Sequence, residues 1–183
     1  MQAFTIALII SLCCLLIWYR WRQRTNNAKD EWDIREATFL YQTRGLSADP
    51  CYLEATSMPQ PKVTNSASSK AFAPPPAPPP PPTPVVIALP DEFMKRIAEK
   101  SPNLKRSSEC EATAHGIVDK KTGQAGGYIF TVSGILWISP TDVEVSGGLR
   151  VGTTVGTSKT YYLKKENGEW QIVGEHLNSI SGG

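Results

Sequence analysis

A tract of prolines near the middle of the chain restricts the fold more than any other feature of the sequence. Nine of the 15 prolines lie between Pro74 and Pro84. Proline fixes φ and lacks a backbone donor, so this tract suits neither a helix interior nor a central strand. It favours polyproline II, which rises about 3.1 Å per residue. We therefore expect a disordered, Pro-rich linker over residues 46–84.

The tract itself has two interpretations. As a stiff spacer, it would hold a folded domain away from whatever precedes it. As a ligand, Pro74–Pro84 would dock on a proline-reading protein partner, because x-P-x-x-P patterns are frequent in it. No arginine flanks the tract, which weakens the docking interpretation.

The N-terminus carries an uncharged and almost wholly apolar run over residues 3–19. A helix of that length spans about 25 Å, at the short end of what crosses a bilayer. Aromatic and basic residues of the kind found at a membrane interface end the run: Trp18, Tyr19, Arg20, Trp21, Arg22 and Arg24. We expect residues 1–24 to form a transmembrane anchor with a basic flank, with residues 3–19 in the lipid bilayer.

A cleaved signal peptide is the rival interpretation of this run. Only Met1 and Gln2 precede it, and no small residue marks a cleavage site after it. The arginines favour the cytoplasmic side of a membrane. The sequence therefore predicts a single-pass protein of the cell membrane with its C-terminal domain in the cytoplasm, and a periplasmic or extracellular domain stays open.

The apolar spacing within residues 25–45 predicts a short amphipathic helix. Ile34, Ala37 and Tyr41 fall on one face at helical spacing. Such a helix would either lie next to the membrane or dock on the distant C-terminal domain.

Residues 85–183 are the stretch that can form a globular core. Asp91 to Lys100 reads as a helix, with an early acidic residue, a late basic one and an apolar stripe. Beyond this helix the apolar pattern changes to alternation, and Asn167–Gly168 is a strong hairpin signal. We expect an α+β domain in which one helix packs on a five-stranded antiparallel sheet.

Several short motifs of this region resemble a group of small uncharacterised bacterial α+β proteins. The motifs are Asp91-Glu-Phe-Met-Lys-Arg, Ser108-Glu-Cys, Asp119-Lys-Lys-Thr-Gly, Trp137-Ile-Ser, Val143-Glu-Val and Lys164-Lys-Glu-Asn-Gly-x-Trp. The resemblance covers about 110 residues. It implies a bacterial origin and no known activity. In that group a segment similar to Ile34–Gln42 comes shortly before the rest, which would make it the first helix of the domain.

The closing hairpin is also similar to the last strands of cystatin-like and nuclear-transport-factor-2-like folds, which is an analogy of fold and carries no function. Residues 85–183 hold 11 Lys and Arg against 11 Asp and Glu, a formal charge of zero. Nucleic-acid binding needs clustered basic residues, so we do not expect a nucleic-acid partner. Cys51 and Cys110 are expected to be buried or idle thiols, because one pair in a chain of this length does not make a disulfide framework.

The residues that could act in chemistry are few. His115 and His176 are the only histidines, and they are weak candidates for a pocket beside neighbouring carboxylates. The loop from Gly152 to Thr160 lacks the Gly-Lys-Ser/Thr order of a phosphate-binding loop. No residue set has the spacing of a metal site, so we expect no catalytic, cofactor-binding or metal-binding residues and no cofactor.

These patterns together predict a membrane-tethered, non-enzymatic interaction module with a protein partner, such as an accessory subunit of a membrane complex. The alternative is a small-ligand-binding or enzymatic domain with a pocket between the helix and the sheet.

Overall fold

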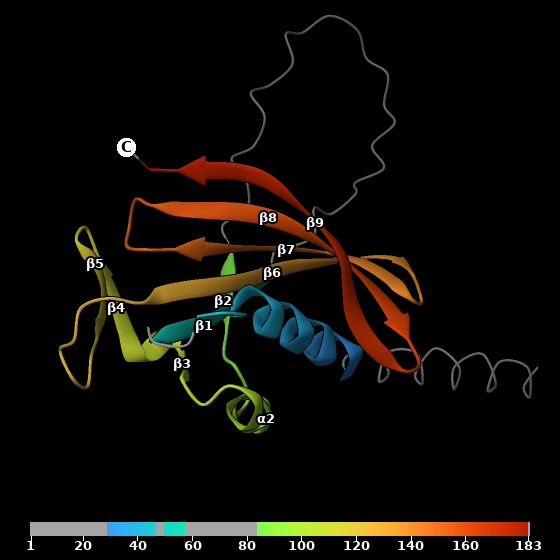
Figure 1. Cartoon of the computed structure of the whole chain (residues 1–183), viewed down its shortest axis with the longest axis horizontal. Coiled ribbons are helices and arrows are strands. Elements are labelled where there is room, and N and C mark those ends of the chain that lie inside the picture. The colour runs from blue at the N-terminus through green and yellow to red at the C-terminus, as the bar shows by residue number, and fades with distance from the viewer. Residues whose placement is uncertain (1–28, 47–49, 58–83, 183) are drawn as a thin grey trace, which may run out of the picture.

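The computed structural model describes residues 29–46, 50–57 and 84–182 of the chain (Figure 1). It contains a helix over residues 29–42, a second helix α2 (Asp91–Lys100) and a short 3-10 turn η1 (Ser107–Glu109). The strands are β1 (Cys51–Ser57), β2 (Val85–Ile87), β3 (Leu104–Arg106), β4 (Cys110–Thr113), β5 (Gly116–Asp119), β6 (Tyr128–Ser139), β7 (Asp142–Arg150), β8 (Gly156–Glu166) and β9 (Glu169–Ser181).

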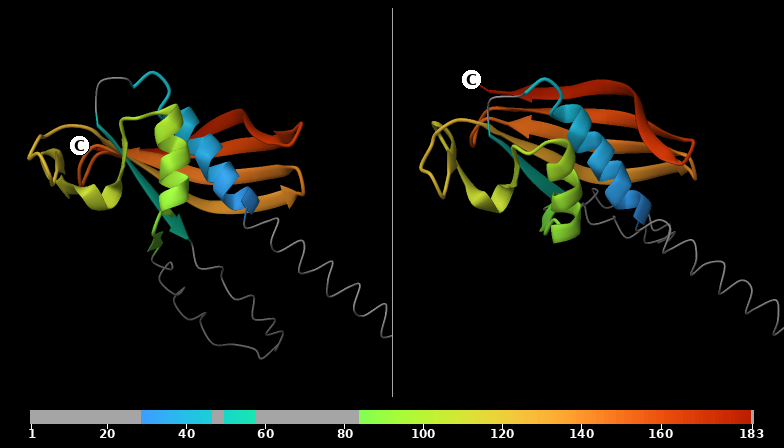
Figure 2. Two further views of the ribbon diagram at one scale, coloured as in Figure 1. Left: turned by 90° about the horizontal axis from the view of Figure 1, so that it is seen from below. Right: turned by 60° about the horizontal axis from the view of Figure 1, so that its bottom comes forward.

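Seven of these strands form one mixed sheet. Its order is β2–β1–β6–β7–β8–β9, and β3 also pairs with β1. Strands β4 and β5 make a separate hairpin. Both helices lie side by side across one face of the sheet, which we call the helix-covered face (Figure 2).

Strands β6 to β9 form an antiparallel meander, as the alternating sequence predicts. Val143 and Val145 of β7 are buried on the helix-covered face, and Val145 is paired with the buried Tyr161 of β8. The turn between β8 and β9 is the expected two-residue hairpin. Asn167 and Gly168 have φ of 53° and 87°, which is the conformation that a type I′ turn requires.

The five-stranded antiparallel sheet predicted from residues 85–183 is wrong, because β1 comes from the predicted linker. β1 is parallel to both β6 and β3 and antiparallel to β2. Leu53 and Ala55 are buried under the helices, and Tyr52 is buried on the opposite face. A strand buried on both faces has no apolar alternation, so its sequence resembles an irregular segment.

The position of β1 also changes the meaning of the Pro-rich tract. Ser57 at the end of β1 is paired with Val85 at the start of β2, so residues 58–84 connect two strands that are paired with each other. The segment is therefore an insertion within the domain and not a spacer in front of it. The tract from Pro74 to residue 83 lies outside the described residues, so its conformation and the docking interpretation stay untested.

The helix over residues 29–42 is part of the core, which decides between the two positions open from the sequence. Its residues Ile34 and Phe39 are fully buried. Trp32 packs on Phe93 of α2 at a ring-centroid distance of 5.0 Å, and Phe39 lies 6.3 Å from the same ring. One apolar cluster thus joins both helices to the sheet.

A polar contact fixes this helix against the sheet. Arg35 is buried and donates to the carbonyl oxygens of Val132 and Ser133 at 3.0 and 3.3 Å. The register of β6 shifts between Val132 and Ile135, and the shift frees carbonyls that the guanidinium takes up. Burial lowers the pKa of Arg35, because desolvation disfavours the charged form.

The opposite face of the sheet is covered only near β1 by the described residues. There the β4–β5 hairpin lies over Tyr52 and Ile129 and contributes Cys110 and Ile117 to a second apolar cluster. Further along β6 to β9 this face exposes large apolar side chains, Leu136 and Tyr162 among them.

The expectation of a single-pass membrane protein is not supported by this structure. No helix within residues 29–46, 50–57 and 84–182 is both long and apolar enough to cross a membrane. The run over residues 3–19, on which the expectation rested, lies outside the described residues.

The contact between Trp32 and Phe93 gives a test of the docked helix. Phe93→Ala is expected to lower the free energy of unfolding by about 3–5 kcal/mol, because it empties a buried site. In a double-mutant cycle with Trp32→Ala, the two rings should couple by about 0.5–1.5 kcal/mol. Chemical denaturation of the four variants measures this coupling. The exposed Lys95→Ala is the control, and strict additivity of Trp32 and Phe93 would contradict the docked position.

Candidate binding surface beside strand β9

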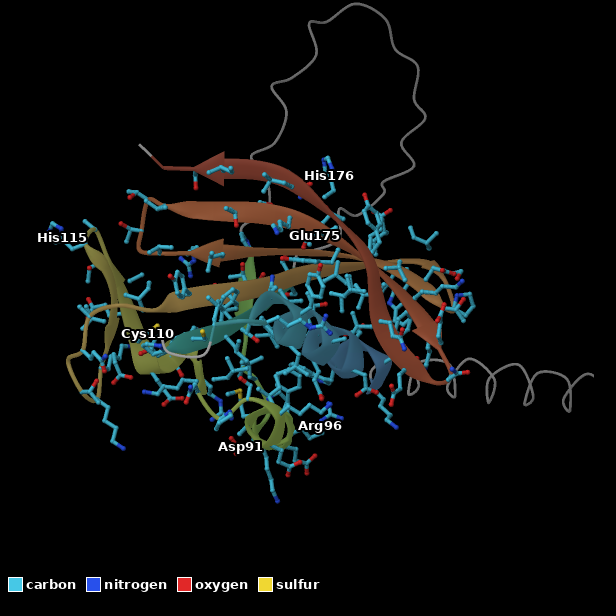
Figure 3. All side chains as sticks on the ribbon, viewed as in Figure 1. Asp91, Arg96, Cys110, His115, Glu175 and His176 are labelled. Carbon is cyan, nitrogen blue, oxygen red and sulfur yellow. The ribbon has the colours of Figure 1, made fainter. Side chains whose placement is uncertain are left out.

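The two histidines do not form a site together. His115 lies in the turn of the β4–β5 hairpin, and His176 lies on β9 opposite Thr160 (Figure 3). Both are exposed, and neither lines either of the two clefts described below. Asp119, a carboxylate four residues after His115 in the sequence, is buried in contacts with other residues.

Two clefts flank the helix over residues 29–42 on the helix-covered face. The first, the helix-end cleft, has a volume of about 470 Å³ and lies between the end of this helix and strands β6 to β9. The second, the interhelical cleft, has a volume of about 790 Å³ and lies between both helices and the start of β9. Tyr41 and Arg44 line both clefts, so the two share one wall.

Polar groups of both charges meet in the helix-end cleft. Lys159 of β8 forms an ion pair with Glu175 of β9 at 2.8 Å, and the contact raises the pKa of Lys159. Gln42 Nε2 donates to the Thr131 carbonyl at 3.3 Å and to the Tyr161 hydroxyl at 3.2 Å. Its Oε1 is buried and accepts no hydrogen bond from the residues that the structure describes.

A glycine in β7 allows the end of the helix to come this close to the sheet. A Cβ at Gly147 would lie 2.8 Å from the Thr131 carbonyl oxygen, 2.9 Å from Gln42 Nε2 and 3.1 Å from the Tyr161 ring. Only a residue without a side chain fits there. Gly147 therefore positions Gln42 and Tyr161 at the cleft.

The interhelical cleft is bordered by ion pairs that connect the two helices. Arg96 of α2 reaches Asp33 at 3.1 Å and Glu36 at 2.9 Å, and Lys100 reaches Glu36 at 2.7 Å. The charges are thus largely neutralised by each other. Trp170 also lines this cleft, and its buried indole N–H has no acceptor among the described residues.

Strand β9 is an edge of the sheet. It ends the strand order, so no strand of the described ranges pairs with its outer side. Its last seven residues, Glu175 to Ser181, are all exposed. Leu177 and Ile180 keep 46% and 72% of their surface exposed, and Val155 at the adjoining loop keeps 48%. We call Val155, Leu177 and Ile180 the apolar corner; it adjoins the helix-end cleft at Thr157, which is paired with Ile180.

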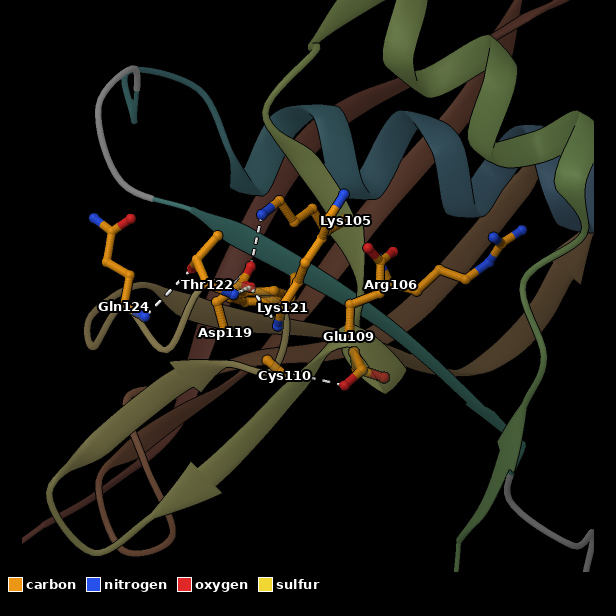
Figure 4. A network of polar contacts seen from close by, with 10 residues as sticks. Lys105, Arg106, Glu109, Cys110, Asp119, Lys121, Thr122 and Gln124 are labelled. Carbon is orange, nitrogen blue, oxygen red and sulfur yellow. Dashed lines mark hydrogen bonds and ion pairs between the residues drawn. The ribbon is translucent and has the colours of Figure 1, made fainter.

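A separate polar network lies on the opposite face (Figure 4). The buried Asp119 carboxylate accepts from the Tyr52 hydroxyl at 2.9 Å and from Lys105 Nζ at 2.6 Å. It also accepts from the backbone N–H groups of Lys121 and Thr122, each at 2.9 Å. Asp119 thus ties β5 and its following turn to β1 and β3, and its role here is structural.

These contacts shift ionisation in consistent directions. The hydrogen bonds from Lys105, Thr122 and Tyr52 hold the pKa of Asp119 well below the ordinary aspartate value. Burial and the bond to Asp119 raise the pKa of Tyr52. Burial also raises the pKa of the Cys110 thiol to about 11, so this thiol stays protonated at neutral pH.

No group of three or more His, Cys, Asp or Glu residues in the described part of the chain could hold a metal ion. Sequence patterns also missed the residues of the two clefts. Lys159 and Glu175 lie across the Asn167–Gly168 hairpin, but Gln42 and Arg44 come from a distant segment that no local spacing relates to them. The only available signal was the pair of glycines at 147 and 148 inside a strand, which indicates a close backbone approach.

The crowded position of Gly147 gives a stability prediction. Gly147→Ala is expected to lower the free energy of unfolding by about 1–3 kcal/mol, because the new Cβ meets backbone and ring atoms. Gly174→Ala is the matched control in the next-but-one strand, where a Cβ would meet only Tyr162 at 3.5 Å. Thermal unfolding of both variants measures the difference, and equal effects would contradict the tight approach of the helix.

The Asp119 network predicts a pH dependence. Because its pKa is lowered on folding, Asp119 stabilises the fold above the ordinary value of 3.8, and this contribution is lost as the pH falls below it. Asp119→Asn should remove that loss, so stability measured at pH 5 and pH 2.5 should fall less than in the unaltered chain. Asp91→Asn, whose side chain is 97% exposed, is the control. Parallel loss in the Asp119 variant and the unaltered chain would refute the assignment.

Comparison with known proteins adds no further information on this surface. No protein-family model matches the chain, and searches of curated proteins and of solved structures find no significant match.

Proposed function

We propose that this domain is a non-enzymatic interaction module that binds an extended segment of another polypeptide at β9. The observation that carries the proposal is the exposed half of this edge strand. From Glu175 to Ser181 it leaves one row of backbone donors and acceptors without a strand partner among the described residues. Unpaired edges of this kind template the addition of a further strand.

The composition of β9 supports this use. Natural edge strands are commonly blocked by lysine, proline or inward charges. β9 contains neither lysine nor proline, and its exposed half carries a single carboxylate, Glu175, which is paired with Lys159. The register does shift near Asn178, which twists the edge, yet Leu177 and Ser179 stay paired with β8 on either side of the shift.

The apolar corner indicates which kind of partner segment would bind. Leu177 and Ile180 expose apolar surface on the helix-covered side of β9, beyond the end of the helix. A partner segment that lies along β9 would bury them at about 25 cal/mol per Å². The near-neutral edge favours an extended, uncharged segment with apolar residues at alternate positions.

Site-specific photocrosslinking tests this proposal in cells that produce the chain. A benzoylphenylalanine in place of Leu177 should give a covalent adduct with another polypeptide on irradiation. The same amino acid in place of Leu136, which is 56% exposed on β6, is the matched control and should give several-fold less adduct. Adding Ile180→Lys should weaken the adduct at residue 177, because a charge then lies at the apolar corner. No adduct at residue 177, or equal adducts at both positions, would overturn the proposal.

A further inference from the structure

The helix-end cleft is distinct in chemistry from the near-neutral edge of β9. Its volume of about 470 Å³ is that of a small-molecule site. Aromatic and aliphatic side chains, Tyr41, Phe130 and Leu149, supply its apolar part. Its polar part combines cations with a carboxylate and with amide and hydroxyl groups.

The cations come from two different elements. Arg44 follows the helix over residues 29–42 and lies over the Tyr41 ring at 5.2 Å. Lys159 projects from β8, and its ammonium group has three donors, of which Glu175 takes one. Both residues line the cleft with donors to spare for an anionic group, and a carboxylate is the group that suits them.

Acceptors line the same cleft. Glu175 carries a negative charge, and Gln42 presents a buried Oε1 that has no donor within the described residues. The orientation of this amide follows from its surroundings, because Nε2 must face the Thr131 carbonyl. A buried acceptor left unpaired costs about 1–3 kcal/mol, and an incoming N–H donor removes that cost.

We propose that the helix-end cleft binds a free α-amino acid with an apolar side chain. The carboxylate of the ligand pairs with Lys159 and Arg44. Its ammonium group donates to Glu175 and to Gln42 Oε1. The side chain packs against Phe130, Leu149 and Tyr41. Glu175 would repel a purely anionic ligand, and Lys159 would repel a purely cationic one. A small molecule that carries both charges therefore fits the cleft best.

This site does not depend on the interaction at β9. Glu175 belongs to both regions, but its side chain lines the cleft, whereas the proposed strand addition uses the backbone of β9 and the apolar corner. Loss of one activity therefore does not entail loss of the other.

Calorimetric titration of the purified full chain tests the site with three aromatic probes. L-Phenylalanine carries both charges, 3-phenylpropionate lacks the ammonium group and 2-phenylethylamine lacks the carboxylate. L-Phenylalanine should bind saturably, and each analogue should bind about tenfold or more weakly, because one charged hydrogen-bonding group is missing. No saturable heat with L-phenylalanine up to about 20 mM would overturn the proposal. Equal binding of an analogue would overturn the assignment of a zwitterion.

Variants locate the binding in the cleft. Glu175→Gln should weaken L-phenylalanine by about tenfold, because the ammonium group of the ligand loses its carboxylate partner. The same variant should not weaken 3-phenylpropionate, which has no ammonium group and no longer faces the charge of Glu175. Lys159→Met should weaken both carboxylates. Lys164→Met, on the opposite face of the same strand, is the control and should change neither. Binding that is insensitive to both cleft variants would place the ligand elsewhere and refute the site.

Discussion

Strand β1 holds the domain together, because both of its edges and both of its faces contact different parts of the chain. It pairs with β6 on one side and with β2 and β3 on the other. Leu53 and Ala55 lie beneath the helices, and Tyr52 supports the β4–β5 hairpin through Asp119. Pairing and burial thus bring β2, β3, β6, the helices and the β4–β5 hairpin together on one strand of seven residues. Without β1, neither helix would have a complete sheet to pack on.

The same arrangement explains why the candidate binding features gather at the other end of the sheet. The helix over residues 29–42 covers the apolar pairs of β6 to β8 and ends at Gln42, where Gly147 permits a close approach. Beyond that point β8 and β9 continue without a helix above them. Glu175, Leu177 and Ile180 are exposed there for this reason, and Lys159 is partly exposed. Lys159 and Glu175 line the helix-end cleft, and Leu177 and Ile180 lie on the open strand edge beside it.

Structural features that depend on patterns local in sequence agree with the sequence-based predictions. Features that depend on contacts between distant segments do not. The α2 helix, the Asn167–Gly168 hairpin and the alternation of β7 and β8 follow from spacing of a few residues. The sequence of β1 resembles a linker, because burial on both faces removes the alternation of apolar and polar residues. A wholly antiparallel sheet was expected, since parallel pairing of β1 with β6 joins segments that more than 70 residues separate. The candidate site residues suggested by type, His115 and His176, line neither cleft.

The sequence by itself determined that residues 91–100 form an amphipathic helix and that a two-residue turn connects the last two strands. These outcomes depend on backbone geometry and on short-range periodicity. Only the tertiary structure decided that the Pro-rich segment is an insertion between two paired strands and that the helix over residues 29–42 belongs to the core. It also decided which charged residues meet in a cleft. The physical reason is that side chains from distant segments become neighbours only through strand pairing and burial, which no local pattern encodes.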